Sequence, residues 1–143
     1  MSSYPLIVGA VMTAIPETIA VDASTASAIT RMEALGVRHL PVMDGDKLVG
    51  LISHRDLQRP RAFLDSSPGV VGPSVGDLCT RELLTVDFDE PLDTLATNMA
   101  EHKVGSALVL EQGDLVGIVT NIDLCRCVAD LVGRIRALEA TAS

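Results

Sequence analysis

The chain has 143 residues, of which 48% are hydrophobic, 21% are charged and 2% are aromatic, and its formal net charge is −8 at pH 7. Polymeric nucleic acids need a basic surface and, for single strands, aromatic stacking platforms, so we exclude this class of partner. No apolar run reaches the ~18 residues of a membrane span, and the N-terminus lacks the regions of a signal peptide. We therefore expect a soluble, cytoplasmic protein without membrane contact, with an aliphatic core.

The predicted elements of the first half of the chain follow one another closely. A helical turn, a short strand, a helix, a hairpin of two β-branched strands and a second helix are expected from the apolar spacing and the turn residues. Asp22, Ser24 and Thr25 supply acceptors for the start of the first helix, and Gly45 lies at the tip of the hairpin. The elements occupy residues 8–12, 18–21, 26–35, 38–43, 47–52 and from 53 onward.

The second half repeats this order at residues 75–79, 85–86, 92–102, 106–110, 115–119 and from 120 onward. Its last helix is expected to continue, because apolar residues recur there at spacings of three and four. We expect this stripe to pack on its own domain; the alternative is a dimer or partner-binding helix. The stripe consists of Val128, Leu131, Val132, Ile135 and Leu138.

The two halves are copies of one unit. An ungapped offset of 67 positions aligns Leu48-Val49-Gly50 with Leu115-Val116-Gly117 and Asp56-Leu57 with Asp123-Leu124. A self-match over some fifty positions indicates an internal duplication. We place repeat 1 at 8–59, a Pro- and Gly-rich linker at 60–74, repeat 2 at 75–128, and a helical extension with tail at 129–143.

Each repeat is a β-α-β-β-α unit, and a unit near 50 residues is too small to bury its sheet securely alone. We therefore predict an α+β (α/β-type) fold in which two units, related by a pseudo-two-fold axis, pack through their sheets and create symmetric clefts.

One motif carries the chemistry of both copies. Each copy has a strand that ends in a hydroxyl residue, Ser53 or Thr120, with a carboxylate three positions later, Asp56 or Asp123. A hydroxyl suits a phosphate oxygen, and an ionised carboxylate can accept both hydrogens of a ribose diol. The arrangement favours a nucleoside phosphate. The alternative is a helix-capping box that binds nothing.

These residues make the chain resemble a tandem pair of cystathionine-β-synthase (CBS) domains, the Bateman module, from about Val8 to Val128. The resemblance rests on both Gly-x-x-Ser/Thr-x-x-Asp-Leu endings, the openings Val11-Met12-Thr13 and Leu78-Cys79-Thr80, and the segment 36–42. It implies a regulatory sensor of adenosine-containing ligands, such as AMP, ADP, ATP or S-adenosylmethionine, that assembles into dimers. It implies no enzyme activity and no cofactor beyond the regulatory nucleotide.

Carried over residue by residue, the resemblance implies two ligand-binding clefts. In one, Asp123 would hold the ribose and Thr120 the phosphate, lined by Thr13, Thr18, Val37, Arg38 and Gly105. In the other, Asp56 and Ser53 take these roles, with Thr80, Thr85, Val104, Gly105 and Arg38. Because the chain has only three aromatic residues, the adenine would lie between aliphatic side chains such as Val37, Val104 and Ile19.

The two copies differ in charge. Cations gather in repeat 1 at Arg38, His39, His54, Arg55 and Arg59, whereas repeat 2 has Ile122 where Arg55 stands. Phosphate groups need cationic donors, so we expect the Asp56 cleft to hold the more highly charged ligand. The alternative interpretation of Arg55 is a solvated side chain in the first turn of a helix, without a role in binding.

Metal and redox roles are not expected. Cys125 and Cys127 lack zinc-ligand or redox spacing, and the third cysteine, Cys79, is isolated, so we interpret all three as buried or idle thiols. The acidic run 87–93 has the pattern of a helix start, although it would also suit Mg²⁺.

The sequence thus predicts a stand-alone regulatory module that acts on a separate, unidentified protein or through its own homodimer. The alternatives are an interaction scaffold with vestigial clefts, an S-adenosylmethionine sensor and an enzyme. An enzyme is disfavoured because no nucleophile motif or phosphate loop is present.

Overall fold

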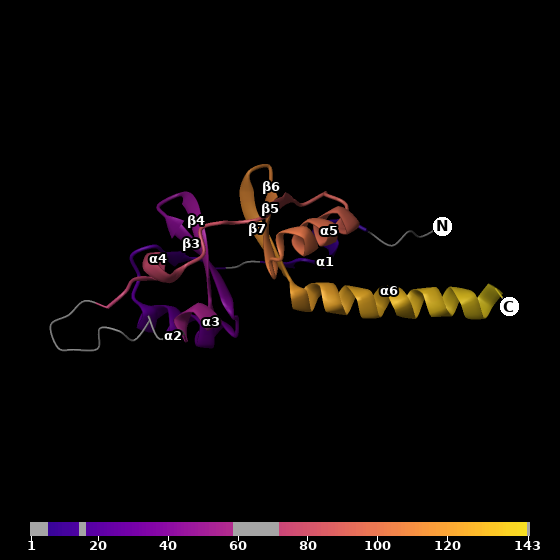
Figure 1. Ribbon diagram of the computed structural model, residues 1–143, viewed down its shortest axis with the longest axis horizontal. Helices are drawn as coiled ribbons and strands as arrows, with labels where there is room; N and C mark the ends of the chain where they lie inside the picture. The colour runs from indigo at the N-terminus through magenta and orange to yellow at the C-terminus, as the bar shows by residue number, and fades with distance from the viewer. Residues whose placement is uncertain (1–5, 15–16, 59–71, 143) are drawn as a thin grey trace. The chain divides into compact units, whose positions relative to one another are not determined.

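A computed structural model describes residues 6–14, 17–58 and 72–142. The chain divides into two compact units (Figure 1). We call residues 16–83 unit 2 and residues 1–15 together with 84–143 unit 1, and we describe each by itself. Arg59 and most of the predicted linker lie outside the described residues.

Unit 2 is built on a three-stranded sheet of order β2-β3-β4. β2 (Ile19–Ala20) pairs with β3 (His39–Asp44) in parallel, and β3 pairs with β4 (Lys47–Ser53) as the predicted hairpin. The helices are α2 (Thr25–Leu35), α3 (His54–Leu57) and α4 (Val75–Leu78). Ser24 caps α2 by accepting a hydrogen bond from the amide of Ser27, as the sequence predicted.

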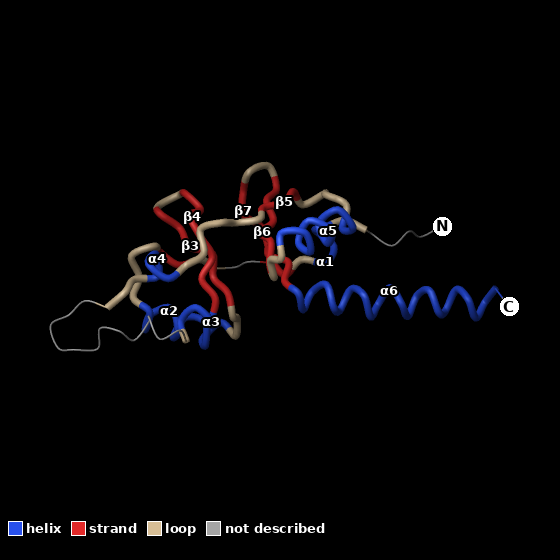
Figure 2. Tube along the Cα trace, viewed as in Figure 1, coloured by secondary structure: helices blue, strands red, loops and turns tan. Residues whose placement is uncertain are grey.

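Unit 1 contains a four-stranded sheet of order β1-β7-β6-β5. Figure 2 labels its strands β5, β6 and β7. β5 (Thr85–Asp87) is parallel to β6 (Ser106–Glu111), and β6 forms a hairpin with β7 (Asp114–Thr120). The remaining elements are α1 (Val8–Val11), β1 (Thr13–Ala14), α5 (Leu92–His102) and α6 (Asn121–Ala142).

The two copies adopt the same internal geometry. β3 and β6 share one burial pattern, as do β4 and β7. Even the register irregularity recurs at matching positions, after Val42 in one hairpin and after Val109 in the other. The predicted mixed α and β fold of two β-α-β-β-α repeats is confirmed.

The segment that opens each sequence repeat packs on the sheet of the other repeat. β1, from the start of the chain, pairs antiparallel with β7, so that Thr13 lies opposite Ile118. Thr80, which follows α4, exchanges two backbone hydrogen bonds of 2.9 Å with Leu51 of β4. Each sheet is therefore extended, beside the second strand of its hairpin, by a segment from elsewhere in the sequence.

Each unit has its own aliphatic core, as the composition required. In unit 2 the most deeply buried side chains include Met32, Leu40, Val42 and Ile52, at 2% exposure or less. The core of unit 1 is formed by Val8, Val86, Leu95, Met99, Ala107, Val109 and Val119. Close packing of aliphatic side chains is the main stabilising contribution in both units.

Most of the stripe on α6 does not pack on its own domain, so this expectation was wrong except for Leu131, which is half-buried. Val128, Ile135 and Leu138 are 60%, 53% and 68% exposed. The helix continues past the part of unit 1 that it contacts, and its second half therefore has no core beneath it (Figures 1 and 2). Among the described residues, no helix is long and apolar enough to cross a membrane.

Candidate functional site

The motif of unit 2 forms a complete capping box at the start of α3. One carboxylate oxygen of Asp56 accepts hydrogen bonds from the Ser53 amide and the Ser53 hydroxyl, both at 2.9 Å. The Asp56 amide in turn donates to the Ser53 hydroxyl oxygen at 3.1 Å. Asp56 is only 5% exposed. The buried carboxylate is thus held in one orientation by two reciprocal contacts.

The motif of unit 1 is built in the same way and gains a third residue. One oxygen of Asp123 accepts from the Thr120 amide at 2.9 Å and from its hydroxyl at 3.3 Å. The other oxygen accepts from the hydroxyl of Thr13 at 3.0 Å, and Asp123 is 8% exposed. The structure therefore brings together Thr13, Thr120 and Asp123, which were all predicted site residues.

Gly50 in β4 and Gly117 in β7 permit the close approach of Thr80 and Thr13 to these strands. A Cβ atom at Gly117 would lie 2.9 Å from the carbonyl oxygen of Thr13 and would also collide with Met12. A Cβ atom at Gly50 would lie 2.9 Å from the carbonyl oxygen of Thr80 and 2.6 Å from the sulfur of Cys79. Only glycine lets the backbone at Thr13 and Thr80 approach β7 and β4 so closely.

The chain next to the two motifs differs in charge, as the sequence predicted. The Arg38 carbonyl accepts from the His54 amide at 2.8 Å, and the Gly105 carbonyl accepts from the Asn121 amide at 3.1 Å. Arg38 and Gly105 thus occupy matching places beside the helix starts, one with an exposed guanidinium and one without a side chain. His39 lies opposite Ser53 in the sheet, where repeat 2 has Ser106. At these matching positions the guanidinium of Arg38 has no counterpart in unit 1.

Burial lowers the pKa of His39 from its ordinary value of 6.5; Asp56 opposes this shift and Arg38 adds to it. The unfolded chain therefore binds the proton more readily than the folded one, and the free energy of unfolding should fall as the pH decreases through 6.5. We expect His39→Gln to reduce this fall, measured by urea unfolding at about pH 7.5 and about pH 5.5. The exposed His102, substituted in the same way, is the control, and an unchanged pH dependence in His39→Gln would contradict the assignment.

The other predicted site residues lie at different distances from the motifs. Thr80 lies beside β4, whereas Thr18 precedes β2, which β3 separates from β4. Thr85 begins β5, on the far side of β6 from β7. Val37 and Val104 are half-buried against their cores, and Arg55 is exposed in α3. The grouping of residues from both units into shared clefts stays a prediction.

Ile19 was expected to contact the adenine, and the structure corrects this expectation. The residue is 6% exposed and belongs to the core of unit 2. Side chains alternate between the two faces of the short strand β2, so that Ile19 points into the core and Ala20 is exposed.

Two neighbours of the motifs were missed as candidate site residues. Asn121 places its side-chain amide against Gly105, where an added Cβ would lie 3.1 Å from the nitrogen. The thiol of Cys79 donates to the Gly76 carbonyl at 3.6 Å, and burial raises its pKa. The repeat offset, which pairs Asn121 with His54, was the signal that would have identified the first of them.

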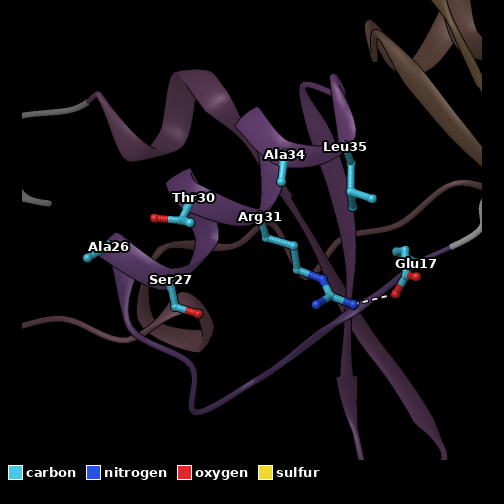
Figure 3. Close-up of a pocket in the computed structure, with 7 residues that line it drawn as sticks. All are labelled: Glu17, Ala26, Ser27, Thr30, Arg31, Ala34 and Leu35. Atoms are coloured by element: carbon cyan, nitrogen blue, oxygen red, sulfur yellow. Dashed lines mark hydrogen bonds and ion pairs between the residues drawn. The ribbon is translucent and has the colours of Figure 1, made fainter.

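A separate hollow of about 500 Å³ lies on unit 2 along α2 (Figure 3). The guanidinium of Arg31 reaches across it to an ion pair with Glu17. Its other lining residues are Ala26, Ser27, Thr30, Ala34 and Leu35. None of the predicted site residues belongs to this hollow. In the part of the chain that the structure describes, no three His, Cys, Asp or Glu side chains are grouped so as to hold a metal ion.

The family comparison decides which class of protein has this geometry. The model of the CBS domain family matches residues 8–60 and 75–130, which cover both motifs. This chain belongs to the CBS domain family. Its two CBS domains form a tandem pair, and in both of them a buried carboxylate, Asp56 or Asp123, accepts hydrogen bonds from the residue that ends the hairpin.

Solved CBS pairs share the fold. The CBS domain pair of protein MJ0100, in complex with 5-methylthioadenosine and S-adenosyl-L-methionine, is 26% identical with a TM-score of 0.72, covering 87% of this chain and 96% of that one. CBSX2 in complex with AMP is 27% identical with a TM-score of 0.67, covering 87% and 97%.

Among curated relatives, the inosine-5′-monophosphate dehydrogenase of Thermoplasma acidophilum is 34% identical over 111 residues. The match covers 75% of this chain but only 20% of the dehydrogenase. The chain thus spans about a fifth of that relative's length, and the likeness does not extend to most of the enzyme.

Proposed function

We propose that this CBS pair is a regulatory sensor that binds an adenosine-containing ligand at its two motifs. The observation that carries the proposal is the duplicated, pre-oriented carboxylate: Asp56 and Asp123 are both buried and both held by a neighbouring hydroxyl residue. A carboxylate fixed in this way accepts a diol without paying the entropy of ordering a free side chain. The complexes of MJ0100 with 5-methylthioadenosine and S-adenosyl-L-methionine and of CBSX2 with AMP support this ligand class.

The two motifs are proposed to take ligands of different charge. Arg38 and Arg55 lie on or beside the α3 start in unit 2, where their guanidinium groups can neutralise a phosphate chain. The matching positions in unit 1 are Gly105 and Ile122, which offer no cation. ATP, ADP or AMP is therefore assigned to the Asp56 motif, and a less charged nucleoside to the Asp123 motif.

The sensor is proposed to act in the cytoplasm, without catalysis, on a separate protein or through its own oligomer. A ligand shifts such a switch only by its differential affinity for two states. Recovery of added ATP unchanged after long incubation would separate this function from that of an enzyme.

A thermal-shift panel tests the proposal. ATP, ADP, AMP, S-adenosylmethionine and 5-methylthioadenosine are each added to the full chain, with GTP and inorganic pyrophosphate as controls for base and phosphate. A ligand at ~100 times its Kd adds ~2.7 kcal/mol of apparent stability, which raises the Tm by several degrees. A Tm that stays flat across the adenine compounds would instead favour an interaction scaffold.

A further inference from the structure

The exposed stripe of α6 is a separate face from the one that packs on unit 1. Asp123 and Cys127, four positions apart, are the buried residues of this helix, at 8% and 6% exposure. Val128 and Ile135 lie on the face of α6 beside the one that carries Asp123 and Cys127, and both are more than half exposed. Because α6 is anchored at its first turns, the bare face is preformed and needs no further folding to bind a partner.

The spacing of the stripe is that of a coiled-coil seam. Val128 and Ile135 take the a positions of a heptad, and Leu131 and Leu138 take the d positions. β-Branched residues at a with leucine at d favour two-stranded, parallel pairing. We propose that α6 pairs with α6 of a second copy of this chain as a parallel coiled coil, independently of any ligand.

The charges beside the seam fit a second copy in this orientation. With the heptad above, Arg134 is at g and Glu139 at the following e position, and in a parallel pair these two positions face each other across the interface. Two Arg134–Glu139 pairs thus form symmetrically. An antiparallel pair centred on the stripe would bring the two Arg134 side chains together instead. Arg134 also bonds Asp130 of its own helix at 3.2 Å, which is compatible because a guanidinium has five donors.

Sedimentation equilibrium of the full chain tests the seam. Ile135→Asp is expected to raise the dimer dissociation constant at least about tenfold, because a charge replaces an a-position contact. Ala129→Asp, which adds the same charge on the exposed outer side of α6, should change it less than about twofold. A wild-type chain that stays monomeric at about 100 µM, or an Ile135→Asp dimer of unchanged strength, overturns the proposal.

Charge reversal and cross-linking test the orientation. Glu139→Arg should weaken the dimer about fivefold, and adding Arg134→Glu should restore it. In a Cys125→Ser background, Leu138→Cys should form an intermolecular disulfide readily, because d positions face each other only in the parallel pair; Ala129→Cys should not. A dimer in which Leu138→Cys fails to cross-link, or in which the double charge reversal restores nothing, contradicts the parallel arrangement.

Discussion

Asp56→Ala should weaken the binding of ATP or AMP about a hundredfold in titration calorimetry, and more than Asp123→Ala does. In the proposed binding mode, the substitution removes two charge-assisted hydrogen bonds to the ribose diol, each contributing about 1.5 kcal/mol. It also leaves Ser53 without the carboxylate that now accepts from its amide and hydroxyl. Because the cations stand beside Asp56, the phosphorylated ligand should depend on this motif more than on the other.

The matched control for this substitution is Asp77→Ala. Asp77 accepts from the Ser74 amide at 2.9 Å in another capping box of unit 2, at the start of α4. Its loss should cost a similar amount of stability, about 1 kcal/mol, without the loss of affinity. Greater loss of ATP affinity in Asp123→Ala than in Asp56→Ala would reverse the proposed ranking of the two motifs.

Gly117→Val and Gly50→Val should each lower the free energy of unfolding by about 3 kcal/mol. Side chains at these positions would run into the carbonyl oxygens of Thr13 and Thr80, which lie 2.9 Å from the place of a Cβ. Backbone atoms cannot move away as a flexible side chain does. The segment at Thr13 must therefore separate from β7, or the segment at Thr80 from β4. Urea unfolding monitored by circular dichroism measures the loss.

Gly133→Ala is the control for the glycine substitutions. Nothing lies within 4 Å of a Cβ at this position, which is inside α6. Alanine there should raise stability by about 0.5–1 kcal/mol, since glycine is a poor helix former. If Gly117→Val were as well tolerated as Gly133→Ala, the close approach of β1 would not be required for stability.

Most of each repeat could be predicted because its signals are local. The helix over 92–102 was located from apolar spacing, and the two hairpins from β-branched runs around tight tips. The contacts of Ser53 with Asp56 and of Thr120 with Asp123 followed from a spacing of three residues at a helix start. Such contacts depend on neighbouring residues alone, so the sequence specifies them directly.

The sequence by itself determined the duplication, the order of the elements and the pair of hydroxyl–carboxylate motifs. Only the tertiary structure decided that Thr13 bonds Asp123, that β1 joins β7, and that the stripe of α6 lies bare. The first two contacts join residues more than a hundred positions apart, and apolar spacing marks a buried face without saying what buries it. On α6 the apolar pattern continues from residues that unit 1 covers to residues that unit 1 leaves exposed.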